Sequence, residues 1–184
     1  MDLTLSWDLF IIVFFAMVIA YAFIIGKHDS VKLVIATYIA TVAVQGLGNI
    51  FERLTGESHA MLSMLGLSVD STILATTKLV FFGAVVIFIM IRSGINIEYG
   101  KEPGTALSTI ITAMFGFATA GLILSTLLTF VSGGAILDTA LADSTNVSPI
   151  IQQSKLMQVL IFNQDLWYAL PAILILGVGF LSSE

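Results

Sequence analysis

The stretch LFIIVFFAMVIAYAFIIG, from Leu9 to Gly26, contains no charged residue and decides the class of this protein. An α-helix rises about 1.5 Å per residue, so these 18 residues form a helix about 27 Å long. The hydrocarbon core of a bilayer is about 30 Å thick, and charged side chains are costly inside it. An uncharged run of this length therefore predicts a membrane-spanning helix at 9–26.

Three further spans are predicted downstream, at 33–51, 71–91 and 106–131. Only the six residues Lys27–Lys32 separate the first span from the second, which indicates an antiparallel hairpin with a short turn. The span at 71–91 contains Lys78, because the uncharged residues after that lysine are too few to cross a bilayer.

Two further segments are apolar but are not clearly predicted as membrane-spanning helices. Residues 57–70 carry Met and Leu among Ser and Gly, which favours an interfacial or re-entrant helix. Residues 166–183 are uncharged and contain Trp167 and Tyr168, a pair that favours the lipid headgroup level, together with Pro171. This last segment is either a fifth span, a re-entrant helix or a helix along the membrane surface.

The amino-acid composition is that of a protein surrounded by lipid. Of the 184 residues 58% are hydrophobic and 10% are charged, with a mean hydropathy of +1.04, whereas soluble domains carry about 25% charged residues. The fold class we predict is all-α, an integral membrane helical bundle that forms a single membrane domain over 1–184. The net charge is −5 and no run of Lys and Arg is present, so we expect membrane lipid and no nucleic acid as a partner.

Basic residues predict the orientation, since short loops rich in Lys and Arg stay on the cytoplasmic side. Four bases, Lys27, Lys32, Arg92 and Lys101, fall after the first and third spans, against Arg53 and Lys155 on the other face, with Lys78 near that face. We therefore expect a multi-pass protein of the plasma membrane with its N-terminus outside.

A polar stripe follows the second predicted span at intervals of four residues, and consists of Thr37, Thr41, Gln45 and Asn49. Residues spaced by four share one helix face. Such a face either lines a water-filled path or a polar binding site, or joins helices through hydrogen bonds.

The fourth predicted span carries a line of small residues at the same spacing, Ser108, Thr112, Gly116 and Ala120. Small residues let helix backbones approach closely, so we expect this line to serve helix packing. Lys78 is the candidate intramembrane charge: its long stem either reaches the interface, with Asp70 or Glu52 as a partner, or marks a functional site.

No pattern points to catalysis. The chain has no cysteine, and His28 and His59 fall in separate predicted loops on opposite faces, so we expect no metal site and no cofactor. The sequence also lacks H-E-x-x-H, G-x-S-x-G and a glycine-rich phosphate loop. We therefore expect no catalytic residue and no enzyme.

The layout resembles the colicin V production protein (CvpA) family of small bacterial inner-membrane proteins. The similar parts are an aspartate before the first span with a glycine and a base after it, a glycine-rich fourth span, and a polar segment before the last apolar helix. In this sequence they are Trp7-Asp8-Leu9 to Ile25-Gly26-Lys27 and 30–40, 113–117 with 121–123, and 143–151 with 166–171. The resemblance implies a bacterial inner membrane and a role in export or envelope homeostasis, without site residues.

From these observations we expect a non-enzymatic protein that acts in transport, export or envelope homeostasis, as a homo-oligomer or within a membrane complex. A slender bundle has few residues to seal a path through one copy, so conduction would need several copies. The alternative is a structural or assembly subunit with no conduction of its own.

Overall fold

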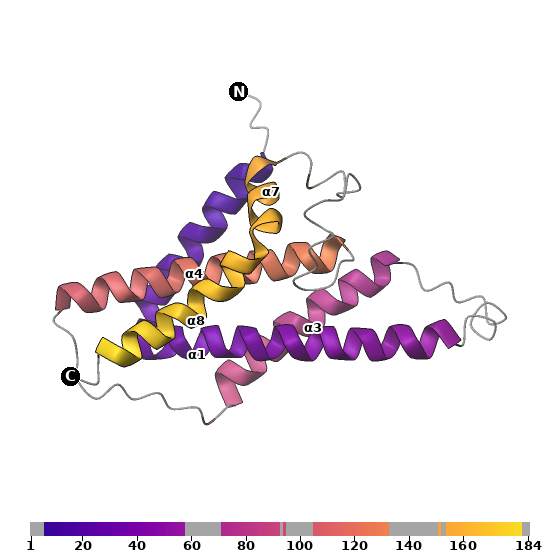
Figure 1. Cartoon of the computed structure of the whole chain (residues 1–184), viewed down its shortest axis with the longest axis horizontal. Coiled ribbons are helices and arrows are strands. Elements are labelled where there is room, and N and C mark those ends of the chain that lie inside the picture. Colours follow the sequence, from indigo (N-terminus) through magenta and orange to yellow (C-terminus); the bar gives the residue numbers. More distant parts are fainter. Residues whose placement is uncertain are drawn as a thin grey trace.

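A computed structural model describes residues 6–57, 71–92, 94, 105–132, 151 and 154–181. Over these residues the chain is helical and contains no strand, which confirms the all-α class. The helices, in chain order, are α1 (Trp7–Glu57), α3 (Ser71–Arg92), α4 (Thr105–Ser132), α7 (Lys155–Phe162) and α8 (Gln164–Leu181) (Figure 1).

Helix α1 is bent at Gly26 into two arms, 7–25 and 27–57. A straight helix of 51 residues would be about 77 Å long, far more than one bilayer crossing. Gly26 adopts φ 81° and ψ 176°, a conformation that is essentially restricted to glycine. Figure 1 shows the two arms leaving this corner in different directions.

The bend replaces the predicted turn at Lys27–Lys32, which is wrong: these residues are helical and begin the second arm. A single glycine reverses the chain because the bend needs only one residue with a positive φ. The Ser30 hydroxyl donates to Gly26 O at 2.7 Å, with Ala22 O 3.3 Å away, and so occupies carbonyls that the bend leaves without a helical partner.

Helix α4 lies at the centre of the bundle. In its most apolar stretch 56% of the residues are buried by other helices, against 11% in α1 and 6% in α3. Phe115, Ala118 and Leu122 are fully buried. Neighbouring helices therefore surround α4, while α1 and α3 keep most of their apolar surface outside.

Contacts along α4 show that the two arms of α1 run in opposite directions. Ile11, at the start of the first arm, shares a buried cluster with Leu124, whereas the far end of that arm lies against Gly116. In the second arm the order is reversed: Val34 clusters with α4 near its start and Val44 with α4 near its end. The two arms thus follow α4 in opposite order, as a hairpin requires, and they diverge from the Gly26 corner (Figure 1).

The other helices alternate in the same way. Trp167, early in α8, belongs to the cluster of Leu124, and Val178, late in α8, belongs to the cluster at the start of α4, so α8 runs antiparallel to α4. In α3, Lys78 lies over Gly48 and Phe82 clusters with the second arm at Ala40 and Val44, so α3 runs antiparallel to that arm. The two arms of α1, α3, α4 and α8 therefore alternate in direction along the chain.

The helix bounds agree with the predicted spans at 71–91 and 106–131, which are α3 and α4. The apolar segment 166–183 coincides with α8. It continues α7 across a bend of 67°, and the two together are long and apolar enough for one broken span or a re-entrant loop. The helix predicted at 57–70 lies outside the described residues, apart from Glu57 at the end of α1.

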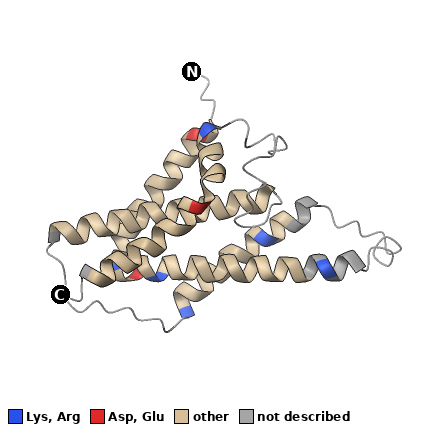
Figure 2. Cartoon of the chain, viewed as in Figure 1, with Lys and Arg blue, Asp and Glu red and all other residues tan. Residues whose placement is uncertain are grey.

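The outside of the bundle is apolar. Large side chains such as Ile24, Ile91 and Phe180 are 81%, 75% and 76% exposed. Figure 2 shows long helical stretches without a charged residue. Three helices are long and apolar enough to cross a membrane, and a fourth if the bent pair α7–α8 is one span. This is an integral membrane protein, since exposure of so large an apolar surface to water would be strongly unfavourable.

Candidate functional site

The break between α7 and α8 lies where polar groups from several helices gather. Helix α7 ends at Phe162 and is followed by its C-cap Asn163, whose backbone N–H and side-chain Nδ2 both donate to Val159 O, at 3.2 and 2.9 Å. Ser125 of α4 donates to Leu160 O at 3.4 Å. The last carbonyls of a helix have few intrahelical partners. Here the side chains of Asn163 and Ser125 donate to two of them, Val159 O and Leu160 O.

Gln164 starts α8 directly after the break and is 5% exposed. Its Nε2 donates to Thr129 Oγ1 at 2.7 Å, and the Thr129 hydroxyl donates to Ser125 O at 2.7 Å. Ser125, Thr129, Asn163 and Gln164 are called the break cluster below. Ser125, Thr129 and Gln164 are buried polar groups at the start of α8, and Asn163, at the end of α7, is exposed.

A second group of hydroxyls lies one turn further along α8. Thr126 donates to Leu122 O at 2.8 Å, so the Tyr168 hydroxyl, 2.9 Å from Thr126 Oγ1, is the donor in that contact. Thr41 Oγ1 lies 3.4 Å from Thr126 Oγ1, and Tyr38 donates to the backbone carbonyl of Tyr168. These four residues, called the hydroxyl cluster below, connect the second arm of α1, α4 and α8.

The predicted polar stripe divides between the bundle interior and its surface. Thr37 and Thr41 are buried, and each donates to the carbonyl four residues earlier, at 2.8 Å. Gln45 Nε2 donates to Asn49 Oδ1 at 3.1 Å, and Asn49 is exposed. Of the four, Thr41 is the one whose side-chain oxygen lies close to a hydroxyl of another helix in the described part of the chain, 3.4 Å from Thr126 Oγ1. The stripe therefore contributes one residue to the site.

The line of small residues in α4 lies at a close helix contact. A β-carbon at Gly116 would lie 2.9 Å from Ala22 Cβ and 2.9 Å from Ile19 Cα of the first arm. Ala120 is fully buried, and the Thr112 hydroxyl donates to Ser108 O at 2.9 Å. At Gly116 the backbones of α4 and the first arm of α1 are in contact, as the small-residue spacing predicts.

Lys78 is 9% exposed and lies against Gly48 of the second arm. A β-carbon at position 48 would come within 2.5 Å of Lys78 Cε and 3.2 Å of Lys78 Nζ. The missing side chain of Gly48 is what makes room for the lysine. Lys78 is therefore buried against the second arm, and both alternatives for it, a stem that reaches the interface or a functional site, stay predictions.

Three aromatic rings pack beside the break. Phe15 of α1, Phe117 of α4 and Trp167 of α8 have centroids 5.2 to 5.9 Å apart. The Trp167 ring covers Gly121, where a β-carbon would lie 2.0 Å from Trp167 Cε3. Trp167 is 8% exposed. Trp167 is thus held inside the bundle, and its position at the headgroup level stays a prediction.

The N-terminal turn of α1 is bonded to the start of α7. Ser154 caps α7: its Oγ accepts from Met157 N at 3.1 Å and donates to the Asp8 carboxylate. Leu156 N also donates to Asp8 Oδ1, at 3.2 Å. An acidic group at a helix N-terminus is stabilised by the exposed N–H groups there. Asp8 therefore ties the first arm to α7.

Most of the clustered residues were missed at the level of sequence. Ser125, Thr126 and Thr129 occur within one turn of α4, a local signal comparable to the stripe in the second arm. Their partners Gln164 and Tyr168 lie in a segment whose apolar character dominated the prediction. Only the fold places these two sequences together.

The described residues contain no group of three or more His, Cys, Asp or Glu side chains that would hold a metal ion. In comparisons with protein-family models, curated proteins and solved structures, nothing matches this chain.

Proposed function

We propose that this protein acts without catalysis in transport or export, by moving a small uncharged polar solute through the bundle at the break between α7 and α8. The observation that carries this proposal is the broken helix itself, with side chains of α4 bonded at the break. Membrane carriers bind their substrates at interrupted helices, where free backbone groups and side chains form a polar site at mid-depth.

The chemistry of the break cluster favours an uncharged solute. Ser125, Thr129, Asn163 and Gln164 offer hydroxyl and amide groups and no charge. A hydroxyl- or amide-bearing solute can replace the bonds that Gln164 and Ser125 make in the closed bundle, at 2.7 and 3.4 Å. An ion would find no opposite charge among these four side chains, and Asp165, the acidic residue next to Gln164 in the first turn of α8, is exposed.

The membrane that we propose is a bacterial inner membrane, as the resemblance to the CvpA family implies, and the orientation that we propose is an outside N-terminus. The placement of bases supports this topology. Lys27 and Lys32 lie at the Gly26 corner, and α3 runs antiparallel to the second arm, so that Arg92 ends α3 toward the same face. Bases gathered at one face are typical of the cytoplasmic side.

Osmotic swelling of proteoliposomes tests the proposal, with glycerol, urea and glycine as probes. Vesicles that contain the protein should swell faster than protein-free vesicles in at least one probe, and Gln164→Leu should slow this swelling several-fold. Asn49→Leu is the matched control, since Asn49 is an exposed amide outside the break cluster. Swelling equal to that of protein-free vesicles in all three probes would refute solute movement.

The second candidate function is a structural or assembly subunit, alone as a homo-oligomer or within a membrane complex. A specific feature favours it: one face of α3 is uncovered, with Val80, Ile87, Phe88 and Ile91 between 60% and 75% exposed. A scaffold would give no swelling in any probe. It would also lose its oligomeric size in detergent when Ile87 and Phe88 are both changed to Ala.

A further inference from the structure

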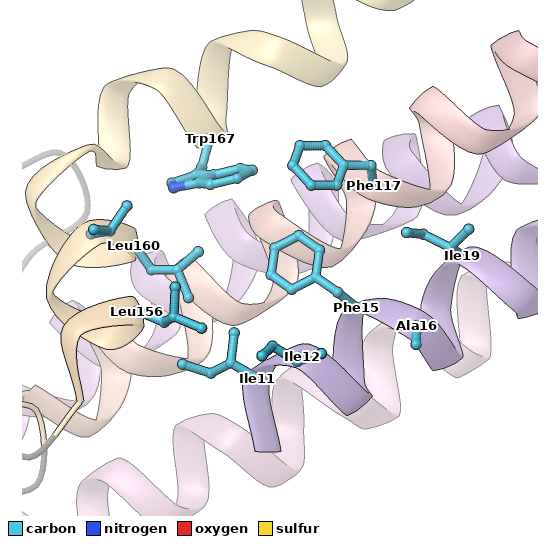
Figure 3. Close-up of a pocket in the computed structure, with 10 residues that line it drawn as sticks. Ile11, Ile12, Phe15, Ala16, Ile19, Phe117, Leu156, Leu160 and Trp167 are labelled. Carbon is cyan, nitrogen blue, oxygen red and sulfur yellow. The ribbon is translucent and has the colours of Figure 1, made fainter. Parts of the chain in front are cut away.

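An apolar groove opens between the first arm of α1 and the α7–α8 pair, and it has a volume of about 430 Å³ (Figure 3). This size lies within the range of ligand sites, roughly 300 to 1,000 Å³. Side chains from the first arm, α4, α7 and α8 line it. They are Ile11, Ile12, Phe15, Ala16, Ile19, Phe117, Leu156, Val159, Leu160 and Trp167.

The groove exists because the first arm is held to its neighbours at two separate levels. At one level Asp8 is bonded to the start of α7, and at the other Ile19 and Ala22 lie against Gly116 of α4. Between these levels α7 turns away from α8 by 67°. The side chains of the first arm do not fill the wedge, since the residue in its middle is Ala16.

The lining suits a hydrocarbon chain. All ten lining residues are apolar, apart from the indole nitrogen of Trp167, and cavities lined by apolar side chains do not hold water. At the rim Ile12 and Val159 are 57% and 49% exposed, so the mouth faces the bilayer. Along the first arm the lining extends from Ile11 to Ile19, about 12 Å of helix, and one leaflet of hydrocarbon is about 15 Å deep.

Two opposite charges stand at one end of the groove. Asp8 lies one turn before Ile12 on the same face of the first arm. Lys155 is exposed and directly precedes the lining residue Leu156. A headgroup that carries both a phosphate and a primary ammonium matches this pair of charges.

We propose that the groove holds one acyl chain of a phosphatidylethanolamine molecule, with the lipid phosphate at Lys155 and its ammonium at Asp8. This site is separate from the break cluster and does not depend on solute movement. The bound chain would fill the wedge between the first arm and α7 and thereby fix the arm's position.

Tryptophan fluorescence tests this proposal directly, because the chain contains two tryptophans, Trp7 and Trp167. In a Trp7→Phe background the remaining indole lines the groove. Titration of the detergent-solubilised protein with phosphatidylethanolamine brominated on its acyl chains should quench the Trp167 emission to a saturating level. Ala16→Phe places a ring in the groove and should remove most of this quenching.

Two variants complete the experiment. Ala20→Phe is the matched control, because Ala20 is exposed on the same arm and does not line the groove, and it should leave quenching unchanged. Lys155→Gln should weaken binding several-fold, and Lys155 is exposed, so folding does not depend on it. Equal quenching in Ala16→Phe and Ala20→Phe, or quenching that never saturates, would overturn the proposal. Equal affinity of the Lys155→Gln protein would overturn the headgroup assignment.

Discussion

Replacing Gly26 by Ala tests whether the bend in α1 depends on a conformation that only glycine adopts readily. At φ 81° and ψ 176° a β-carbon meets its own backbone, and such residues cost roughly 1 to 3 kcal/mol. No other atom lies within 4 Å of that β-carbon, so packing adds nothing. We expect Gly26→Ala to lower the free energy of unfolding by about 1 to 3 kcal/mol.

Gly46→Ala is the matched control. Gly46 lies in the helical second arm, and again no atom lies within 4 Å of the added β-carbon. Alanine in a helix is favoured over glycine by roughly 0.5 to 1 kcal/mol, so this variant should be slightly more stable than the natural protein. The two substitutions add the same atom, and they differ in the backbone conformation that receives it.

The assay is reversible unfolding of both variants in mixed detergent micelles, followed by circular dichroism. A distance measurement gives a second readout, since the chain has no cysteine and spin labels can be placed at Ser6→Cys and Arg53→Cys. A straightened α1 would put these positions about 70 Å apart, whereas the bent helix keeps them closer. Equal stabilities of the Gly26→Ala and Gly46→Ala proteins, with unchanged label distance, would refute the reasoning.

Other contacts give further expected outcomes. Gly121→Ala drives a methyl group into the Trp167 ring, where a β-carbon would lie 2.0 Å away, and should cost about 1 to 3 kcal/mol in the same unfolding assay. Tyr168→Phe removes the hydroxyl 2.9 Å from Thr126 and should cost only about 0.6 kcal/mol, because hydrogen bonds between membrane helices are individually weak. Ser154→Ala removes the cap of α7 and should cost about 1 kcal/mol, seen also as faster hydrogen exchange at the start of that helix.

The membrane class and the bounds of α3 and α4 could be predicted from the sequence because they depend on hydropathy and length. The runs at 71–91 and 106–131 have charged or glycine-rich flanks, and these flanks are where α3 and α4 end. Such signals are local, so no tertiary information is needed to read them.

The bend at Gly26 could not be read in the same way. A glycine next to Lys27 is typical of a turn, and the sequence does not say whether a turn takes six residues or one. The basic residues of Lys27–Lys32 suggested a loop, yet Lys27 is 7% exposed inside the second arm. Packing of Ser30 and Val31 on the bundle favours helix over the loop that composition indicates.

The candidate site was the least predictable part. The stripe at Thr37 and Thr41 was recognised from its spacing. Its contacts in the cluster come from distant parts of the chain: Thr126 follows Thr41 by 85 residues, and Tyr168 follows Thr126 by 42 residues. Which polar residues meet depends on how α8 leaves the break at Asn163, and no local pattern specifies that angle.

The most direct test of the account is the membrane side of the two chain ends. The two arms of α1, α3, α4 and α8 alternate in direction, and if each arm of α1 and the broken α7–α8 pair is one crossing, the proposed topology has five crossings. Reporters of membrane side fused before Met1 and after Glu184 should therefore lie on opposite sides, with the C-terminal reporter in the cytoplasm. Reporters on the same side would contradict the five alternating segments and the broken span on which the proposed site depends.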